Sequence, residues 1–254
     1  MSDFTLKKYR ELLQSLIEAG YSFQKFEDFL QSPKDNMIVL RHDVDLLPLN
    51  SLAFAKLQAE NDIKGVYYFR AVPQSWDDDI IKAIHELGHE IGYHYECLTT
   101  TKGNLEKGIK DFEKNLKELR KLAQVSTICM HGSPMSKHDS KNLWKHYDYR
   151  DYGIIGEPYF DVDFKEVFYL TDTGRKWDGD KVSVRDRVDS GFDLSFHKTD
   201  EIIAAAKANK LPNQIMFTFH PQRWNDSRMQ WTKELLLQNA KNTIKRIIKK
   251  SRTS

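Results

Sequence analysis

Short apolar runs alternate with segments of helical periodicity along the whole chain. The runs are rich in β-branched and aromatic residues, as is typical of strands buried on both faces. They lie at 37–40, 66–69, 90–94, 126–130, 167–170 and 215–219, with a weaker one at 153–155. This sustained alternation predicts one α/β domain over residues 1–254, with a mostly parallel sheet of about seven strands.

We expect this sheet to curl into a distorted (β/α) barrel. Helical spacing of apolar residues predicts helices between the strands, at 6–19, 24–30, 49–61, 77–87, 105–122, 200–208 and from 229 onward. An open doubly wound sheet is the alternative. It is less favoured because the chain has no Gly-x-Gly-x-x-Gly turn and no Walker loop to support a nucleotide site.

Composition excludes several classes of protein. A formal net charge of +2 gives no reason to expect nucleic acid as a partner. No apolar run approaches the roughly 20 residues that cross a bilayer, and the first residues lack the apolar core of a signal peptide, so we expect a cytoplasmic protein. Cys97 and Cys129 form no Cys-x-x-Cys pair, which argues against a disulfide framework and against a cysteine zinc cluster.

Charged and metal-competent side chains follow six of the predicted strands. The carboxyl ends of parallel strands meet at one rim, where α/β proteins build their sites. One such residue alone is as well explained by a polar turn or a helix cap, but their recurrence predicts a single shared site. The residues are Asp43 and Asp45, Arg70, His94 and Glu96, His131, Asp172 and His220.

The chemistry of this set is that of a metal-dependent hydrolase. Imidazole nitrogens and carboxylate oxygens suit zinc or a similar divalent ion that keeps one coordination position open. Such an ion lowers the pKa of a bound water towards ~7 and polarises a carbonyl oxygen. A further carboxylate can accept the proton of the water, and a further histidine can protonate the leaving group.

Two sequence motifs resemble those of the polysaccharide deacetylase superfamily, also called carbohydrate esterase family 4. The most specific match is Gly88-His89-Glu90-Ile91-Gly92-Tyr93-His94, and Arg41-His42-Asp43-Val44-Asp45 corresponds to the paired aspartates of the family. The resemblance covers roughly residues 37–224. It implies a distorted (β/α) barrel, a divalent metal ion and removal of an N-acyl group from a sugar.

The resemblance also implies a role for each matching residue. Asp43 would be the general base, Asp45 and His94 metal ligands, and His89 a structural residue. The third motif, His131-Gly132-Ser133-Pro134, would line the groove. The fourth motif would supply Asp172, the partner of the general acid, and Trp177, a wall of the pocket. The fifth motif, His220-Pro221, would supply His220 as the general acid.

The chain departs from the family pattern at two points. The second histidine of the family is replaced by Leu98, which cannot bind a metal. Glu96 or His131 would then be the third ligand, and Glu96 shares a strand face with His94. The third motif lacks the arginine that normally orients the base. Three arginines could replace it: Arg41, Arg70 and Arg175.

The leading hypothesis is a hydrolase that removes an N-acyl group, such as acetyl, from an amino sugar, a glycan precursor or a related amide. We expect Arg41, Arg70, Trp177 and Trp224 to contact the substrate, although a tryptophan at a helix position is as often part of the core. One alternative is a non-catalytic carbohydrate-binding domain on a decayed barrel, which Leu98 favours. The other is a glycosyltransferase that holds its metal with Asp43 and Asp45.

Overall fold

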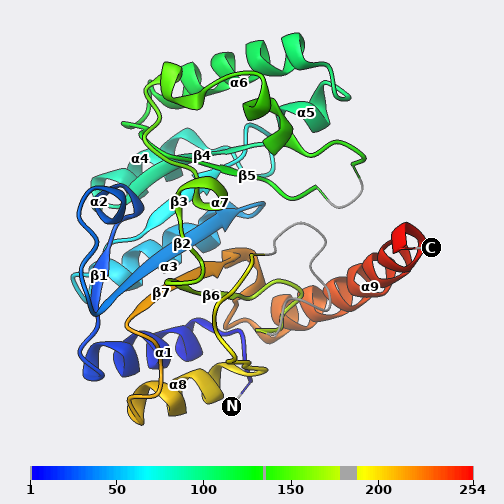
Figure 1. Ribbon diagram of the computed structural model, residues 1–254. Helices are drawn as coiled ribbons and strands as arrows, with labels where there is room; N and C mark the ends of the chain where they lie inside the picture. Colours follow the sequence, from blue (N-terminus) through cyan, green and yellow to red (C-terminus); the bar gives the residue numbers. More distant parts are fainter. Residues whose placement is uncertain (1, 134–135, 178–187, 254) are drawn as a thin grey trace.

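Seven strands form one parallel sheet in the computed structural model, which describes residues 2–133, 136–177 and 188–253 (Figure 1). The sheet order is β5-β4-β3-β2-β7-β6, and β1 pairs with β2 beside this path. The sheet curls into a half-barrel, so the predicted α/β class and distorted (β/α) barrel are confirmed. The strands are β1 (Ser22–Gln24), β2 (Met37–Val44), β3 (Val66–Phe69), β4 (Glu90–Tyr95), β5 (Ile128–Met130), β6 (Phe168–Thr171) and β7 (Gln214–Phe219).

Helices connect the strands, and most of them cover the convex face of the sheet (Figure 1). The helix Phe26–Gln31 instead packs with Met37 and Val39 of β2 on the other face. Helix α9 extends away from the half-barrel, and no helix in the described part of the chain is long and apolar enough to cross a membrane. The helices are α1 (Leu6–Glu18), α2 (Phe26–Gln31), α3 (Pro48–Ala59), α4 (Asp78–Glu86), α5 (Cys97–Thr100), α6 (Leu105–Leu119), α7 (Pro158–Asp161), α8 (Thr199–Lys207) and α9 (Arg228–Thr253), with short 3₁₀ turns at η1 (Ser140–Lys145), η2 (Tyr149–Tyr152) and η4 (Pro221–Arg223).

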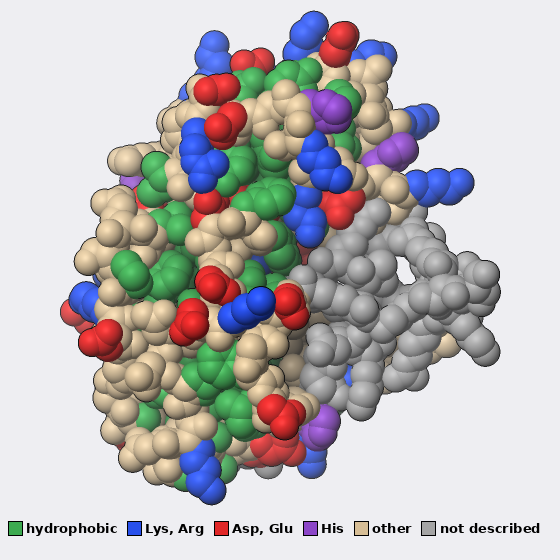
Figure 2. Space-filling model, viewed as in Figure 1, with side chains coloured by type: hydrophobic (Ala, Val, Ile, Leu, Met, Phe, Trp, Pro, Cys, Tyr) green, Lys and Arg blue, Asp and Glu red, His purple; other side chains and the backbone are tan. Residues whose placement is uncertain are grey.

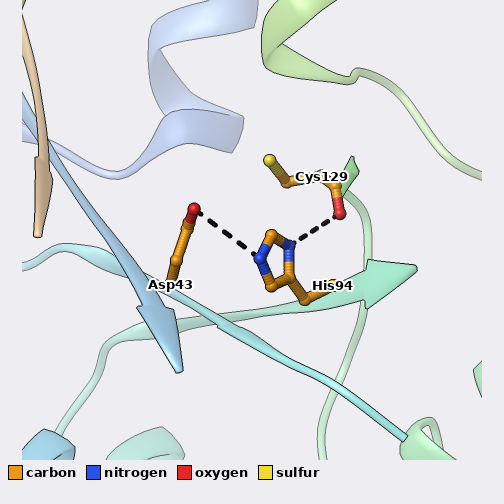
Figure 3. Close-up of side chains that lie close together, drawn as sticks. All are labelled: Asp43, His94 and Cys129. Carbon is orange, nitrogen blue, oxygen red and sulfur yellow. Dashed lines mark hydrogen bonds and ion pairs between the residues drawn. The ribbon is translucent and has the colours of Figure 1, made fainter. Parts of the chain in front are cut away.

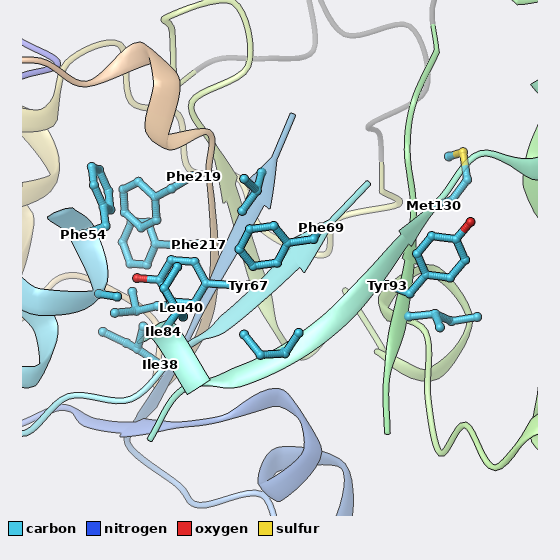
Figure 4. Close-up of a cluster of buried hydrophobic side chains, with 14 of the residues drawn as sticks. Ile38, Leu40, Phe54, Tyr67, Phe69, Ile84, Tyr93, Met130, Phe217 and Phe219 are labelled. Atoms are coloured by element: carbon cyan, nitrogen blue, oxygen red, sulfur yellow. The ribbon is translucent and has the colours of Figure 1, made fainter. Parts of the chain in front are cut away.

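Strand β2 shows how the two faces of the sheet differ. Ile38 and Leu40 belong to the larger apolar cluster beneath the helices, part of which is drawn in Figure 4. Met37 and Val39 belong to a second cluster on the opposite, concave face. Because side chains alternate along a strand, Arg41 and Asp43 continue the concave face towards the carboxyl end of β2.

The structure extends β2 beyond its predicted end at Leu40. All eight residues of the strand are buried, including Arg41, His42 and Asp43. His42 lies on the convex side, where its Nδ1 is 3.0 Å from the Val66 carbonyl oxygen and its ring stacks on Tyr67 at 4.0 Å between centroids. The polar residues can stay inside the strand because each finds a buried partner.

One predicted strand is absent, and one observed strand was not predicted. Residues 153–155 form no strand, and the only pairing there is an isolated bridge between Thr127 and Gly156. The seventh strand is instead β1, which is only three residues long and pairs with the amino-terminal half of β2. A polar segment of this length carries no alternation that could reveal it in the sequence.

A buried carboxyl group lies on the concave face near the amino ends of the strands. Glu90 of β4 accepts a hydrogen bond from the Glu27 backbone amide at 2.9 Å and another from the Thr127 hydroxyl. Burial raises the pKa of Glu90 to about 8. The folded protein therefore retains a proton on Glu90 at pH values where the unfolded chain has lost it.

We predict that Glu90→Gln stabilises the protein, and that the gain grows with pH. A carboxyl whose pKa rises on folding, here from 4.5 to about 8, lowers the free energy of unfolding as pH increases across that range. Glutamine keeps the acceptor oxygen and cannot ionise. Thermal unfolding of both proteins between pH 4 and pH 9 measures the difference, which should rise from near zero and level off above about pH 8.

The matched control is Glu86→Gln, because Glu86 is exposed at the end of α4. It should leave the pH dependence of the melting temperature unchanged. A gain for Glu90→Gln that is equal at pH 4 and pH 9 would contradict the raised pKa.

Candidate functional site

Three histidines face one carboxylate at the carboxyl ends of the strands. Asp45 follows β2, His94 lies in β4, His131 follows β5 and His220 follows β7. Asp45 Oδ1 lies 3.7 Å from Nε2 of His94 and 3.4 Å from Nε2 of His131. Asp45 Oδ2 lies 3.9 Å from Nε2 of His220. The parallel order of the strands brings these distant parts of the sequence to one place.

Each of the three imidazole rings is held at its other nitrogen. Nδ1 lies 2.9 Å from the Cys129 carbonyl oxygen in His94, 3.0 Å from Glu96 Oε2 in His131 and 2.6 Å from Asp172 Oδ1 in His220. These oxygens accept hydrogen bonds, so a ring that carries a single proton, as a metal-binding histidine does, holds it on Nδ1. The lone pair on each Nε2 is then directed towards Asp45, an arrangement typical of histidines that bind metal ions.

The carboxylates around Asp45 are each paired with an arginine. Arg41 holds Asp43 at 2.7 Å, Arg70 holds Glu96 at 2.7 Å and Arg223 holds Asp172 at 2.6 Å. Asp45 has no such pair within the described ranges, and its Oδ1 is a buried atom with no hydrogen-bond partner there. A cation placed against this oxygen would balance the charge of the carboxylate.

The protonation states suit a cation at this position. Burial lowers the pKa of His94 to about 4, so its ring is neutral at pH 7 and can act as a ligand. Burial alone would raise the pKa of Asp45, but the rings of His131 and His220 hold it well below its usual range. One oxygen of Asp45 and the Nε2 atoms of His94 and His131 therefore form a donor set that fits zinc or a similar divalent ion.

A second group of ligand-type atoms lies beside the first. One ligand atom from each of Asp43, His94 and Cys129 falls within 4.8 Å of the others. In Figure 3, His94 faces Asp43 on one side and the backbone oxygen of Cys129 on the other. Because Arg41 already occupies both carboxylate oxygens of Asp43, this residue is less suited to bind a metal than Asp45.

Asp43 is fixed in position by its arginine. Arg41 Nε and Nη2 donate to Oδ1 and Oδ2 at 2.8 and 2.7 Å. Burial alone would raise the pKa of Asp43, but Arg41 and His94 hold it below its usual value. Its Oδ2 lies 3.6 Å from His94 Nε2, next to Asp45. Among the three arginines proposed from the sequence, Arg41 is therefore the one that orients the predicted base.

Glu96 lies behind His131. Its Oε1 accepts a hydrogen bond from Arg70 Nε, and its Oε2 accepts from His131 Nδ1 and from the Ser133 hydroxyl. Burial alone would raise the pKa of Glu96, but His131 and Arg70 lower this pKa to about 2. Both oxygens of Glu96 are thus engaged, and it is His131 whose side chain faces Asp45. Arg70 also donates to the Asp45 backbone oxygen at 3.2 Å.

Asp172 is the centre of a buried network behind His220. Its carboxylate accepts from the Arg223 guanidinium at 2.6 Å, the Trp224 indole at 2.7 Å and the His220 backbone amide at 3.0 Å. Burial alone would raise the pKa of Asp172, but Arg223 and His220 lower it. Asp172 is therefore a charged group that holds His220 in one orientation.

The two tryptophans expected to contact a sugar are part of the core. Trp177 is 3% exposed and donates to the Thr199 hydroxyl, and Trp224 is 1% exposed. Neither offers a ring face to a ligand, so the expectation that they bind substrate is wrong. Trp224 directly follows η4 and donates its indole N–H to Asp172.

Sequence analysis missed several residues of the site. Gln222 donates to Asp45 Oδ2 at 3.3 Å, Arg223 supports Asp172, and Cys129 lies next to His94. The first two follow His220-Pro221 directly, so a search around that motif could have found them. His89 bonds to backbone groups of Gly65 and Ala55 outside the site, in line with the structural role expected for it.

Pro134 belongs to the third motif and Gly92 to the second. Pro134 lies outside the described residues. Gly92 packs against Tyr68, because a Cβ there would lie 2.3 Å from the tyrosine ring. The second glycine of the Gly-His-Glu-Ile-Gly-x-His motif thus lets β3 and β4 place a large ring on the concave face beneath His94.

Comparisons with known proteins identify only distant structural similarity. No family profile matches the chain, and no curated protein sequence matches it. A CE4 family pseudoenzyme from Bacillus anthracis has a TM-score of 0.47 at 12% identity, over 84% of this chain and 62% of the other. The chain therefore spans less than two thirds of that protein.

Two CE4 esterases give similar values. One from Streptococcus mutans has a TM-score of 0.45 at 11% identity, over 86% of this chain and 85% of the other. A family 4 carbohydrate esterase from Streptomyces lividans, in complex with acetate, has a TM-score of 0.43 at 11% identity, over 80% and 87%. At these identities, any function must be argued from the geometry of the site itself.

Proposed function

We propose that the chain is a metal-dependent hydrolase that removes an N-acyl group, such as acetyl, from an amino sugar, a glycan precursor or a related amide. The observation that carries this proposal is the Asp45 carboxylate, which is partly buried, faces the Nε2 atoms of three histidines and has no arginine of its own in the described structure. We take the class of substrate from the resemblance of the sequence motifs to those of the polysaccharide deacetylase superfamily.

The proposed metal ligands are Asp45, His94 and His131, and zinc is the ion that this mixed donor set favours. His131 takes the place of the family histidine that is Leu98 here, and Leu98 is buried in the core at 3% exposed. Glu96 orients His131 through Nδ1. When bound, such an ion supplies Lewis-acid chemistry, acidifying water and polarising an acyl carbonyl.

Asp43 and His220 are the proposed base and acid. Asp43 is charged, oriented by Arg41 and next to Asp45, which places it to take a proton from an attacking water. His220 is held by Asp172 and directs Nε2 into the same site, which places it to protonate the departing amine. Asp43 lies in β2 and His220 follows β7, so the two groups approach the site from different strand ends.

Zinc affinity separates the proposed ligands from the residue that orients one of them. We predict that His131→Ala abolishes stoichiometric zinc binding, as do Asp45→Ala and His94→Ala. Glu96→Gln should weaken binding by about 10- to 100-fold without abolishing it, which is the usual effect of losing such an orienting contact. Calorimetric titration of chelator-treated protein with zinc measures these affinities.

The control for this series is His146→Ala, since His146 is exposed and lies outside the site. It should bind zinc like the wild type. Unchanged zinc affinity in His131→Ala, together with loss in Glu96→Gln, would assign the third ligand to Glu96 instead.

Asp43→Asn tests the base. Asparagine keeps the shape of the side chain and an oxygen for Arg41, but it cannot accept the proton of the water. We expect acetate release from a panel of N-acetylated amino sugars to fall by about 10²–10⁴-fold while zinc stays bound. Asp35→Asn, in the exposed segment before β2, is the control. Loss of zinc in Asp43→Asn would show that the roles of Asp43 and Asp45 are reversed.

His220→Ala tests the acid. We expect its turnover number to fall by about 10²–10⁴-fold, the usual contribution of a positioned acid. The fall should be smaller for a substrate whose leaving group needs no proton, such as an acetyl ester of a nitrophenol. Steady-state kinetics with both kinds of substrate measure this. Equal losses on the two substrates would remove His220 from the role of acid.

A further inference from the structure

A pocket adjoins the candidate site on the side of α5 and the segment that follows β5. It has a volume of about 550 Å³, and His131 and Ser133 form its inner wall. These two residues also contact Glu96 in the site, at 3.0 and 3.2 Å. A ligand in the pocket is therefore adjacent to the proposed metal position.

The outer wall of this pocket is positively charged. Lys102 and Lys137 line it, together with Ser136 and His138, and none of the lining residues is acidic. Both lysines are exposed, and neither has an ion pair within the part of the chain that the structure covers. In Figure 2, lysine and histidine side chains stand at the edge of the molecule where α5 lies in Figure 1.

The surface of α6 provides a useful contrast. A larger groove there is also lined by lysines, including Lys110 and Lys114, but Glu113 and Glu118 lie between them. Charges of both signs on one helix face are typical of a solvated surface. The pocket beside His131 has no acidic lining residue to offset its lysines, so its positive potential favours an anionic ligand.

The two sides of the pocket are in contact. The His138 ring packs against Gly103, since a Cβ at that glycine would lie 2.4 Å from His138 Nδ1. Lys102 and Gly103 both have positive φ angles, 53° and 82°, so the chain turns sharply between α5 and α6.

We propose that this pocket binds a phosphate group of the substrate, so that the acylated amino sugar is a sugar phosphate. The proposal rests on the proposed function and names its substrate class. Lysine ammonium groups bind phosphate as point charges, and hydroxyl groups such as that of Ser133 can donate hydrogen bonds to it. A neutral sugar can accept hydrogen bonds from the lysines, but it has no negative charge to balance theirs.

The test compares the binding of three small molecules by calorimetry: N-acetylglucosamine 1-phosphate, N-acetylglucosamine and inorganic phosphate. Zinc-loaded wild type should bind the sugar phosphate at least about tenfold more tightly than either of the others. Lys102→Ala combined with Lys137→Ala should remove most of this preference, roughly threefold to tenfold for each lysine. The matched control is Lys110→Ala combined with Lys114→Ala, on α6, which should keep it.

An additional variant separates the pocket from the metal. Asp45→Ala, measured without zinc, should retain the preference for the sugar phosphate, because the lysines supply it. Three results would overturn the proposal: equal affinity for the two sugars, a preference that survives loss of both lysines, or a preference that disappears in Asp45→Ala. Inorganic phosphate that binds as tightly as the sugar phosphate would also overturn it.

These outcomes are distinct from failure of the proposed function. A lysine-dependent preference for the sugar phosphate, without acetate release from any acylated sugar, would support the pocket and refute the hydrolase. Acetate release with no preference between the two sugars would support the hydrolase and refute the pocket.

Discussion

Compensation of buried negative charge organises the concave face of this half-barrel. Four carboxylates lie together at the carboxyl ends of the strands, and three of them are paired with arginines: Asp43 with Arg41, Glu96 with Arg70 and Asp172 with Arg223. Each of these pairs in turn holds or flanks a group that faces Asp45. The fourth carboxylate, Asp45, is partly buried and has no arginine partner among the described residues, and we propose that a metal ion balances its charge.

The arginine pairs also determine what each carboxylate can do. A carboxylate with both oxygens on one guanidinium, as in Asp43, is rigid and stays ionised, which suits a proton acceptor better than a metal ligand. Glu96 and Asp172 each hold the Nδ1 of a histidine whose Nε2 faces Asp45. In the function that we propose, the four carboxylates differ as ligand, base and supporting groups because each has different hydrogen-bond partners.

Much of the fold and part of the site could be predicted from the sequence, because both depend on local patterns. Apolar runs marked six of the strands, and the polar residues after them marked the rim. The third ligand could not be decided in this way, because Glu96 and His131 have equally suitable side chains. Only the tertiary contact between Glu96 and Arg70 shows which of them is turned aside. The burial of Trp177 and Trp224 likewise depends on packing that no local pattern reveals.

The most direct test of this account is X-ray absorption spectroscopy at the zinc edge on reconstituted protein. We predict a first shell of nitrogen and oxygen atoms at about 2.0–2.1 Å, with the outer-shell scattering of two imidazole rings and no sulfur. Sulfur scattering at about 2.3 Å would instead place the metal between Asp43, His94 and Cys129. Protein that binds no zinc at all would contradict the central claim that Asp45 is balanced by a metal ion.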